Sequence, residues 1–285
     1  MVKYRLLFGT LMTVIFAAVV ILDGWLDGSL TESAVDKPVQ GTIFCILISL
    51  LAIPAQLELS KLASRKNLQI FLPVTIIASV LFATYWYWQQ FANIPHETCY
   101  PFLLVFTLLA LLLYQYVRFG TSSVLANCGA SYFSILYLGL LSSFCVAIRV
   151  QFGLWQLLMF VFVIKSADIG AYTIGSLYGK HNFSPRLSPK KSWEGMGGAV
   201  AFAVIVAIGF AAGCDIIPIW SAVIFGFCFA FIGQIGDLVE SMIKRDAEQK
   251  DSANKVPGFG GILDIIDSPL VAAPFAYLFF LLCSR

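Results

Sequence analysis

Long apolar runs, separated by short polar segments, recur along the whole chain. They lie at about 5–23, 41–59, 69–91, 100–117, 132–148, 153–173, 194–213, 217–235 and 262–283. Each is close to the ~20 residues that an α-helix needs to cross a bilayer, although polar residues enter the ends of the sixth, eighth and ninth. Composition agrees, since 59% of the residues are hydrophobic and 12% are charged, against roughly 25% charged in soluble domains. The pattern predicts an all-α, multi-pass integral membrane protein with about nine transmembrane helices.

Lysine and arginine are distributed unevenly between the two sides of the predicted membrane. If the N-terminus is cytoplasmic, most of the 18 basic residues fall in inside loops, as the positive-inside rule requires. Lys37, Arg149 and Arg285 remain outside. We therefore expect the two charge-rich loops, 174–193 and 236–261, to face the cytoplasm, and a bacterial chain to lie in the cytoplasmic membrane. A basic cytoplasmic face attracts anionic lipids, so we expect a bilayer partner and no nucleic acid.

The two halves of the chain differ in character. Residues 1–150 form runs with almost no internal charge, and we interpret them as a membrane scaffold. Residues 151–285 carry acids and bases within and beside the runs, and we interpret them as a catalytic region whose cavity faces the cytoplasm. The seven cysteines are scattered without CxxC or Cys/His spacing, so neither a disulfide framework nor a zinc site is predicted.

The densest group of polar side chains lies between residues 237 and 268. Asp237, Glu240, Ser241, Lys244 and Arg245 are spaced so that a helix would put them on one face. Asp264 and Asp267 are three residues apart and would share a face of the last helix, while Lys250 and Asp251 lie between the two groups. Two carboxylate faces beside a basic cluster suit a divalent metal that holds a polyphosphate.

Glycines precede this last helix. Gly260 and Gly261 follow Pro257-Gly258-Phe259, and glycine permits positive φ and a close backbone approach to an anion. The same segment is also compatible with a tight turn before the last span. The acids on both sides favour a functional role.

Two further polar segments lie upstream. Asp168 falls within or beside an apolar run, where it either pairs with Lys165 one turn away or lines a polar cavity. The loop that follows holds four residues suited to a phosphate cradle, namely Ser188, Lys190, Lys191 and Ser192. Ser192 is equally suited to cap the next helix. We interpret His181 as a loop residue rather than a metal ligand.

These motifs resemble those of the phosphatidate cytidylyltransferase (CDP-diacylglycerol synthase) family. That family has Ser-x-x-Lys-Arg, four residues, Lys-Asp, and later Pro-Gly-His-Gly-Gly-x-x-Asp-Arg-x-Asp-Ser. The chain matches with Ser241, Lys244, Arg245, Lys250, Asp251, Pro257, Gly258, Gly260, Gly261, Asp264, Asp267 and Ser268. The upstream segments around Asp168, Gly179-Lys180 and 188–195 also resemble family motifs, so the match covers roughly 165–270.

The chain departs from this pattern at two positions. Phe259 stands where the family has His, and Ile265 stands where it has Arg. The carboxylates of the pattern are intact. Arg186 and Lys255 are two cations that could replace the missing charge, so the departures bear on substrate binding and rate more than on the reaction class.

The resemblance implies that the phosphate of phosphatidate attacks the α-phosphorus of CTP, giving CDP-diacylglycerol and pyrophosphate. It implies Mg²⁺ held by Asp237 and Asp264, with a second metal ion compatible with the site. Lys244, Arg245, Lys190 and Lys191 would neutralise phosphates. The remaining acids, which are Asp251, Asp267, Asp168 and Glu240, would act as further ligands or orient the cations.

Two other functions remain open at this stage. A CTP-dependent kinase for a polyprenol-type lipid alcohol would share the nucleotide and metal sites, but it needs a base for the hydroxyl proton. A transporter would spread its polar residues through the membrane depth, whereas these gather at one side. The sequence does not fix the oligomeric state, and a homodimer is compatible with it.

Overall fold

The computed structural model describes residues 2–30, 39–91, 96–249, 252–253 and 260–283. Within them the chain is helical, with one isolated antiparallel bridge between Asn182 and Ser192. The helices are α1 (Val2–Leu26), α2 (Thr42–Ser64), α3 (Leu72–Ala83), α4 (Tyr85–Trp88), α5 (His96–Phe119), α6 (Val124–Ile135), α7 (Leu141–Gln151), α8 (Leu154–Tyr178), α9 (Trp193–Cys214), α10 (Ile219–Asp246) and α11 (Leu263–Cys283). A π-helical segment, η1 (Leu136–Leu140), joins α6 to α7.

Seven of the described helical stretches are long and apolar enough to cross a membrane. They are Thr42–Ser64, Cys99–Phe119, Val124–Gln151, Leu154–Tyr178, Trp193–Cys214, Ile219–Asp246 and Leu263–Cys283. The chain is therefore an all-helical, multi-pass integral membrane protein. The other two predicted runs are shorter apolar helices, Leu11–Leu26 and Leu72–Ala83. The run predicted at 69–91 is divided at Thr84, which separates α3 from α4.

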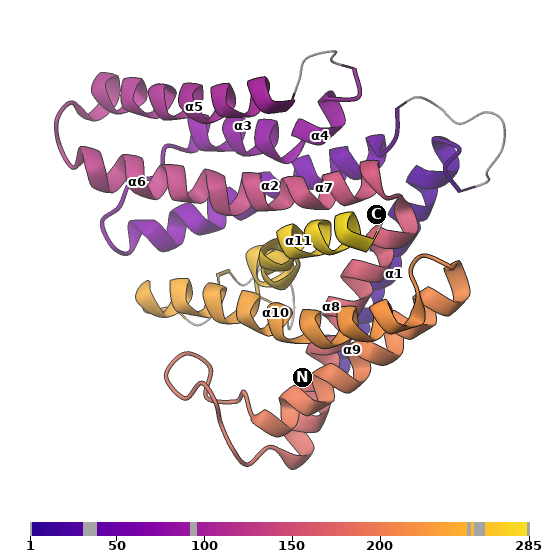
Figure 1. Cartoon of the computed structure of the whole chain (residues 1–285). Helices are drawn as coiled ribbons and strands as arrows, with labels where there is room; N and C mark the ends of the chain where they lie inside the picture. Colours follow the sequence, from indigo (N-terminus) through magenta and orange to yellow (C-terminus); the bar gives the residue numbers. More distant parts are fainter. Residues whose placement is uncertain (1, 31–38, 92–95, 250–251, 254–259, 284–285) are drawn as a thin grey trace.

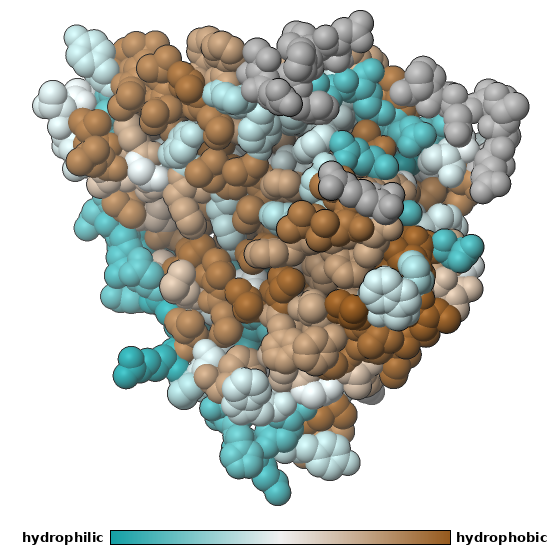
Figure 2. Space-filling view, in the orientation of Figure 1, coloured by the Kyte–Doolittle hydropathy of each residue, from teal (hydrophilic) through white to brown (hydrophobic). Residues whose placement is uncertain are grey.

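The helices form two groups joined by α11. One group contains α2, α3, α5, α6 and α7, and the other contains α8, α9 and α10, with α11 between them (Figure 1). Helix α11 packs against α10 on one side and α7 on the other. Figure 2 shows apolar surface over much of the visible face. Polar surface lies along the left and lower edges, where Figure 1 places the end of α10 and the loop after α8, and also at the upper right.

Glycines allow the helices that carry the polar motifs to approach closely. A Cβ on Gly170 of α8 would collide with the backbone of Gly198 in α9. A Cβ on Gly236 of α10 would lie 2.8 Å from the Cα of Ser268 in α11. Small residues at membrane helix interfaces bring backbones together in this way. The contact at Gly236 brings the residues that follow it, beginning with Asp237, close to the first turns of α11.

A buried ion pair holds the N-terminal helix in place. Arg149 of α7, with no exposed surface, contacts Asp23 at 2.8 Å and Asp27 at 2.6 Å. Asp23 also accepts hydrogen bonds from the backbone N–H groups of Ile43 and Phe44, at 2.7 and 3.4 Å. It thereby caps α2, whose first residue follows a glycine that has no side chain to do so. The sequence predicted Arg149 among the residues outside the membrane, and the structure places it buried at the end of α7.

Candidate functional site

Three carboxylates from α10 and α11 form one group, which we call the acidic cluster. It consists of Asp237, Glu240 and Asp267, whose nearest carboxylate oxygens all lie within 4.8 Å of one another. Asp237 and Glu240 share a helix face because they are three residues apart. Glu240 and Asp267 are buried, while Asp237 is partly exposed. Carboxylates brought this close repel one another unless cations or protons compensate them.

Two lysines contact the acidic cluster directly. The ammonium of Lys191 lies 2.7 Å from Asp237 Oδ2 and donates to the backbone carbonyl of Gln234 at 3.0 Å. Lys244 lies 2.5 Å from Glu240 Oε2 and also 2.5 Å from Asp264 Oδ1. Lys191 comes from the loop after α8 and Lys244 from the last turns of α10. The site therefore joins segments that are separated in the sequence.

A third lysine lies beside the cluster on α8. Lys165 Nζ donates to the carbonyl oxygen of Ile265 at 2.9 Å and lies 3.6 Å from Asp168 Oδ2. Asp168 in turn accepts a hydrogen bond from Gln234 Nε2 at 3.3 Å. The Lys165–Asp168 ion pair expected from the spacing is present. The pair lies beside the acidic cluster and is part of a larger group of polar side chains.

Asp264 has a different environment from the one expected. We expected it to form the metal-binding pair with Asp237, but the described residues group Asp237 with Glu240 and Asp267. Besides Lys244, Asp264 accepts hydrogen bonds from the Ser252 hydroxyl at 2.6 Å, the Ser252 amide at 3.1 Å and the Gly261 amide at 2.7 Å. These donors orient it toward the glycine turn. Gly260, with φ of 96°, takes the left-handed backbone conformation that this turn requires.

The charges of the site do not balance. The carboxylates are Asp168, Asp237, Glu240, Asp264 and Asp267, and the ammonium groups among them are Lys165, Lys191 and Lys244. If all were ionised, two negative charges would be left over. Oxygen ligands with an excess of negative charge suit a divalent cation such as Mg²⁺. The residues present therefore fit a bound divalent metal at the acidic cluster.

The other predicted residues lie around this centre. Arg245 is exposed, and its guanidinium donates to the carbonyls of Leu187 at 3.4 Å and Gln249 at 3.1 Å. Ser188 stabilises a turn, accepting from the Lys191 amide through its carbonyl at 3.1 Å. Ser192 caps α9, since its hydroxyl accepts from the Gly195 amide at 3.2 Å.

Two predicted residues, Lys250 and Asp251, lie outside the described residues, as do Phe259 and Lys255. Arg186 is exposed, and the cation that lies beside Ile265 is Lys165. His181 is an exposed loop residue, as expected, and its ring contacts Glu194 at 2.6 Å.

The N-terminal half contributes polar groups that the sequence interpretation missed. Glu58 of α2, fully buried, accepts hydrogen bonds from the Leu263 amide at 3.0 Å and the Ser252 hydroxyl at 3.3 Å. Its presence inside a predicted span was the signal that could have found it. Tyr137, in the π-helical segment, places a buried hydroxyl without a hydrogen-bond partner among the described residues. Such π-helical segments are frequent at functional sites.

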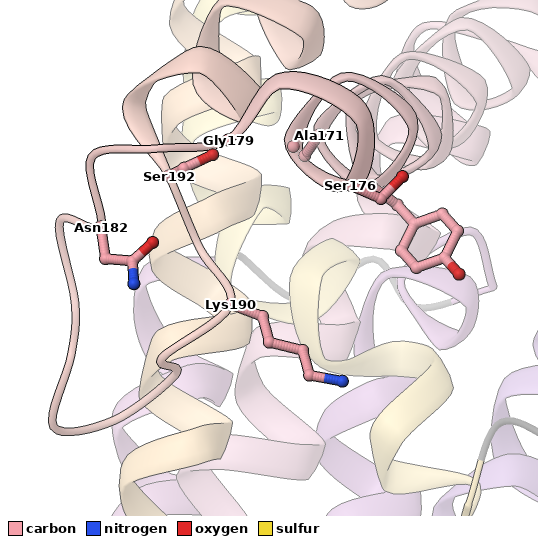
Figure 3. A pocket seen from close by; sticks show the side chains of 8 residues that line it. Ala171, Ser176, Gly179, Asn182, Lys190 and Ser192 are labelled. Atoms are coloured by element: carbon pink, nitrogen blue, oxygen red, sulfur yellow. The ribbon is translucent and has the colours of Figure 1, made fainter.

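A cavity of about 350 Å³ lies between α8 and the loop that follows it (Figure 3). Its lining residues are Ala171, Tyr172, Gly175, Ser176, Gly179, Asn182, Lys190 and Ser192. Lys190 is adjacent in sequence to Lys191, which contacts Asp237. The loop thus connects the cavity to the acidic cluster.

Comparison with known proteins identifies the family of this chain. The sequence profile described as "Cytidylyltransferase family" matches residues 3–283. The chain is 38% identical over 152 residues to the phosphatidate cytidylyltransferase of Bacillus subtilis, covering 52% of this chain and 56% of that protein. It is 34% identical over 160 residues to the protein of the same name from Mycobacterium leprae, covering 55% and 50%. For the protein of that name from Haemophilus influenzae, the identity is 39% over 134 residues, covering 45% and 46%.

The profile match extends over nearly the whole chain, and the chain therefore belongs to the cytidylyltransferase family. The alignments with the three named relatives span about half the length of each of those proteins.

Proposed function

We propose that the protein is a metal-dependent phosphatidate cytidylyltransferase, which transfers a cytidylyl group from CTP to phosphatidate. The observation that carries this proposal is the Lys191–Asp237 contact, which joins a basic loop to the acidic cluster in a member of the cytidylyltransferase family. The three relatives named above bear the name of this activity. The apolar exterior suits a lipid substrate whose acyl chains remain in the bilayer.

The proposed reaction exchanges one phosphoanhydride bond for another. A phosphate oxygen of phosphatidate forms a bond to the α-phosphorus of CTP, and the bond from that phosphorus to the bridging oxygen of the β-phosphate breaks. Pyrophosphate leaves with that oxygen and its electron pair. The attacking oxygen is already anionic, so the reaction needs no strong general base. Positioning of the reactants and neutralisation of their charge supply the catalysis.

The acidic cluster would hold Mg²⁺, through Asp237, Glu240 and Asp267. The bound cation would neutralise charge on the CTP phosphates. Lys191 and Lys244, each already in contact with a cluster carboxylate, would turn toward phosphate oxygens as these arrive. Asp264 would hold Lys244 in position, and as a member of the expected metal pair it could ligate a second ion once Lys244 moves.

We further propose that the charge-rich segments 174–193 and 236–261 face the cytoplasm, where CTP is available. Both were expected to be loops, but residues 174–178 are the end of α8 and residues 236–246 are the last turns of α10. If the seven long helical stretches, α1 and the α3–α4 segment all cross the membrane, nine segments span it. This orientation then puts the N-terminus in the cytoplasm. The excess of basic residues in the predicted inside loops supports it.

The label that reaches the lipid tests the proposed reaction. Purified protein is incubated with Mg²⁺, phosphatidate and CTP labelled either in the cytosine ring or at the γ-phosphate. Cytidylyl transfer puts only the ring label into the lipid. Lipid that carries only the γ-label, in the presence of a polyprenol, would instead identify a CTP-dependent kinase and overturn the proposal.

A further inference from the structure

We propose that the cavity between the end of α8 and the 179–192 loop binds the cytosine and ribose of CTP. This inference rests on the proposed function and assigns the two ends of the nucleotide to different places. The phosphates would lie toward Lys191 and the acidic cluster, and the nucleoside would lie in the cavity. At about 350 Å³ the cavity is within the usual size range of small-molecule sites.

The charges around the cavity disfavour a phosphate group inside it. Lys190 is the one cation among its lining residues. Its α8 wall belongs to the last two turns of that helix, whose carbonyl end carries partial negative charge. The N-terminus of α9 is already compensated, because Ser192 accepts from the Gly195 amide and Glu194 lies in the first turn. An anion placed there would face a helix C-terminus and a helix N-terminus that Ser192 already caps.

A neutral nucleoside suits the same surroundings. Helix carbonyls accept hydrogen bonds from an amino group or from ribose hydroxyls. The Asn182 amide can both donate and accept, as the edge of cytosine requires, and it has no partner among the described residues. Gly175 and Gly179 line the cavity without side chains, which leaves room for a flat ring. Asn182 and Lys190 extend from the loop opposite Ser176 on α8 (Figure 3).

One face of α8 carries both Asp168, which lies beside the polar site, and the residues of α8 that line the cavity. Asp168, Ala171, Tyr172, Gly175 and Ser176 recur at three- and four-residue spacing, so they share one face of the helix. The three residues from Asp168 to Ala171 correspond to a rise of about 5 Å. The nucleoside of a bound nucleotide can therefore reach the cavity while its phosphates lie beside Asp168 and Asp237.

A substitution that fills the cavity tests the inference. A Cβ on Gly175 would lie 3.4 Å from Ser192 Oγ and 3.5 Å from Gly195 Cα, so Gly175→Ala fits. Gly175→Leu adds bulk between α8 and Ser192, at the wall of the cavity that both Gly175 and Ser192 line. We expect Gly175→Leu to raise the KM for CTP about tenfold or more. Asn182→Ala, which cannot fill the cavity, should raise it about fivefold through a lost hydrogen bond. The control is Gly197→Leu on α9, where an added Cβ meets nothing within 4 Å.

Three quantities separate the outcomes, namely the KM for CTP, the KM for phosphatidate and the inhibition constant of pyrophosphate. The inference predicts that only the first rises in Gly175→Leu and Asn182→Ala. A parallel rise in the pyrophosphate constant would assign phosphates to the cavity, and a rise in the phosphatidate KM would assign the lipid head group. Either result, or unchanged constants in folded variants, overturns the inference. The proposed function is tested separately, because it stands as long as the wild-type protein synthesises CDP-lipid.

Discussion

Glu58 in α2 accepts a hydrogen bond at 3.0 Å from the backbone N–H of Leu263, the first residue of α11. It also accepts from the Ser252 hydroxyl at 3.3 Å, and Ser252 in turn donates to Asp264. A carboxylate of the N-terminal half thus caps the helix that carries Asp264 and Asp267. The N-terminal half, which the sequence predicted to be a scaffold, therefore contributes a residue that contacts the start of α11.

Removing this carboxylate should destabilise the start of α11. Glu58→Leu leaves the buried Leu263 N–H without its acceptor, which costs about 1.5–3 kcal/mol for a hydrogen bond to a charged group. We expect a lower Tm in detergent and a reduced rate. Glu248→Leu, at an exposed position beyond α10, is the control. Equal Tm values for the two variants would show that Glu58 does not support α11.

Lys165 should be replaceable by a cation at position 265. Its ammonium lies 2.9 Å from the carbonyl oxygen of Ile265. Ile265 occupies the sequence position at which the family pattern has Arg. We expect Lys165→Ala to lower kcat/KM about tenfold or more, because the carboxylates beside it lose a compensating charge. Adding Ile265→Arg should restore much of the activity. The rescue separates charge from packing, since an arginine on α11 would not repair a packing defect on α8. If the double variant were no more active than Lys165→Ala, the charge of Lys165 would not be what it contributes to kcat/KM.

The pH dependence of stability should report on Asp27. Burial acts to raise the pKa of Asp27, but hydrogen bonds from Ser29 and from the Gly41 amide, together with the charge of Arg149, hold it below the ordinary value of 3.8. The ionised form therefore stabilises the fold above about pH 4, and this stabilisation is lost as the pH falls through the depressed folded value. Asp27→Asn should lower the Tm at neutral pH, and the difference from wild type should shrink below about pH 4.

The matched control for this titration is Asp246→Asn. Asp246 is largely exposed and lies 3.5 Å from Lys66, and exposed ion pairs contribute little. The Tm of Asp246→Asn should stay near that of the wild-type protein at every pH. A constant difference between Asp27→Asn and wild type down to pH 3 would contradict the prediction for Asp27.

The proposed orientation predicts which loops an impermeant reagent can reach. Single cysteines at Asn182 and Ala253, in a variant without the seven native cysteines, should resist labelling in intact cells and react after permeabilisation. A cysteine at Glu32, in a predicted outside loop, should react in both conditions. Labelling of positions 182 and 253 from outside would reverse the topology and remove the argument for access of cytoplasmic CTP.

Periodicity predicted the helices and the shared faces because both depend on neighbours along the chain. Asp237 and Glu240 were therefore placed together correctly. The pairing of Asp264 with Lys244, and of Glu58 with Leu263, depends on how separate helices pack, which spacing does not encode. The division of the 69–91 run at Thr84 was missed because hydropathy alone does not detect a short break between two apolar helices.

The most direct test of the central claim is the Mg²⁺ dependence of cytidylyl transfer in Asp237→Asn and Asp267→Asn. Each substitution keeps the side-chain shape but removes a charge where phosphate charge must be neutralised. We predict a loss of turnover of about a hundred- to a thousand-fold in each variant, with a double variant that loses much less than the sum. Asp246→Asn should remain near wild type. Near-normal turnover in both single variants across the magnesium titration would contradict the claim that the acidic cluster holds the catalytic metal.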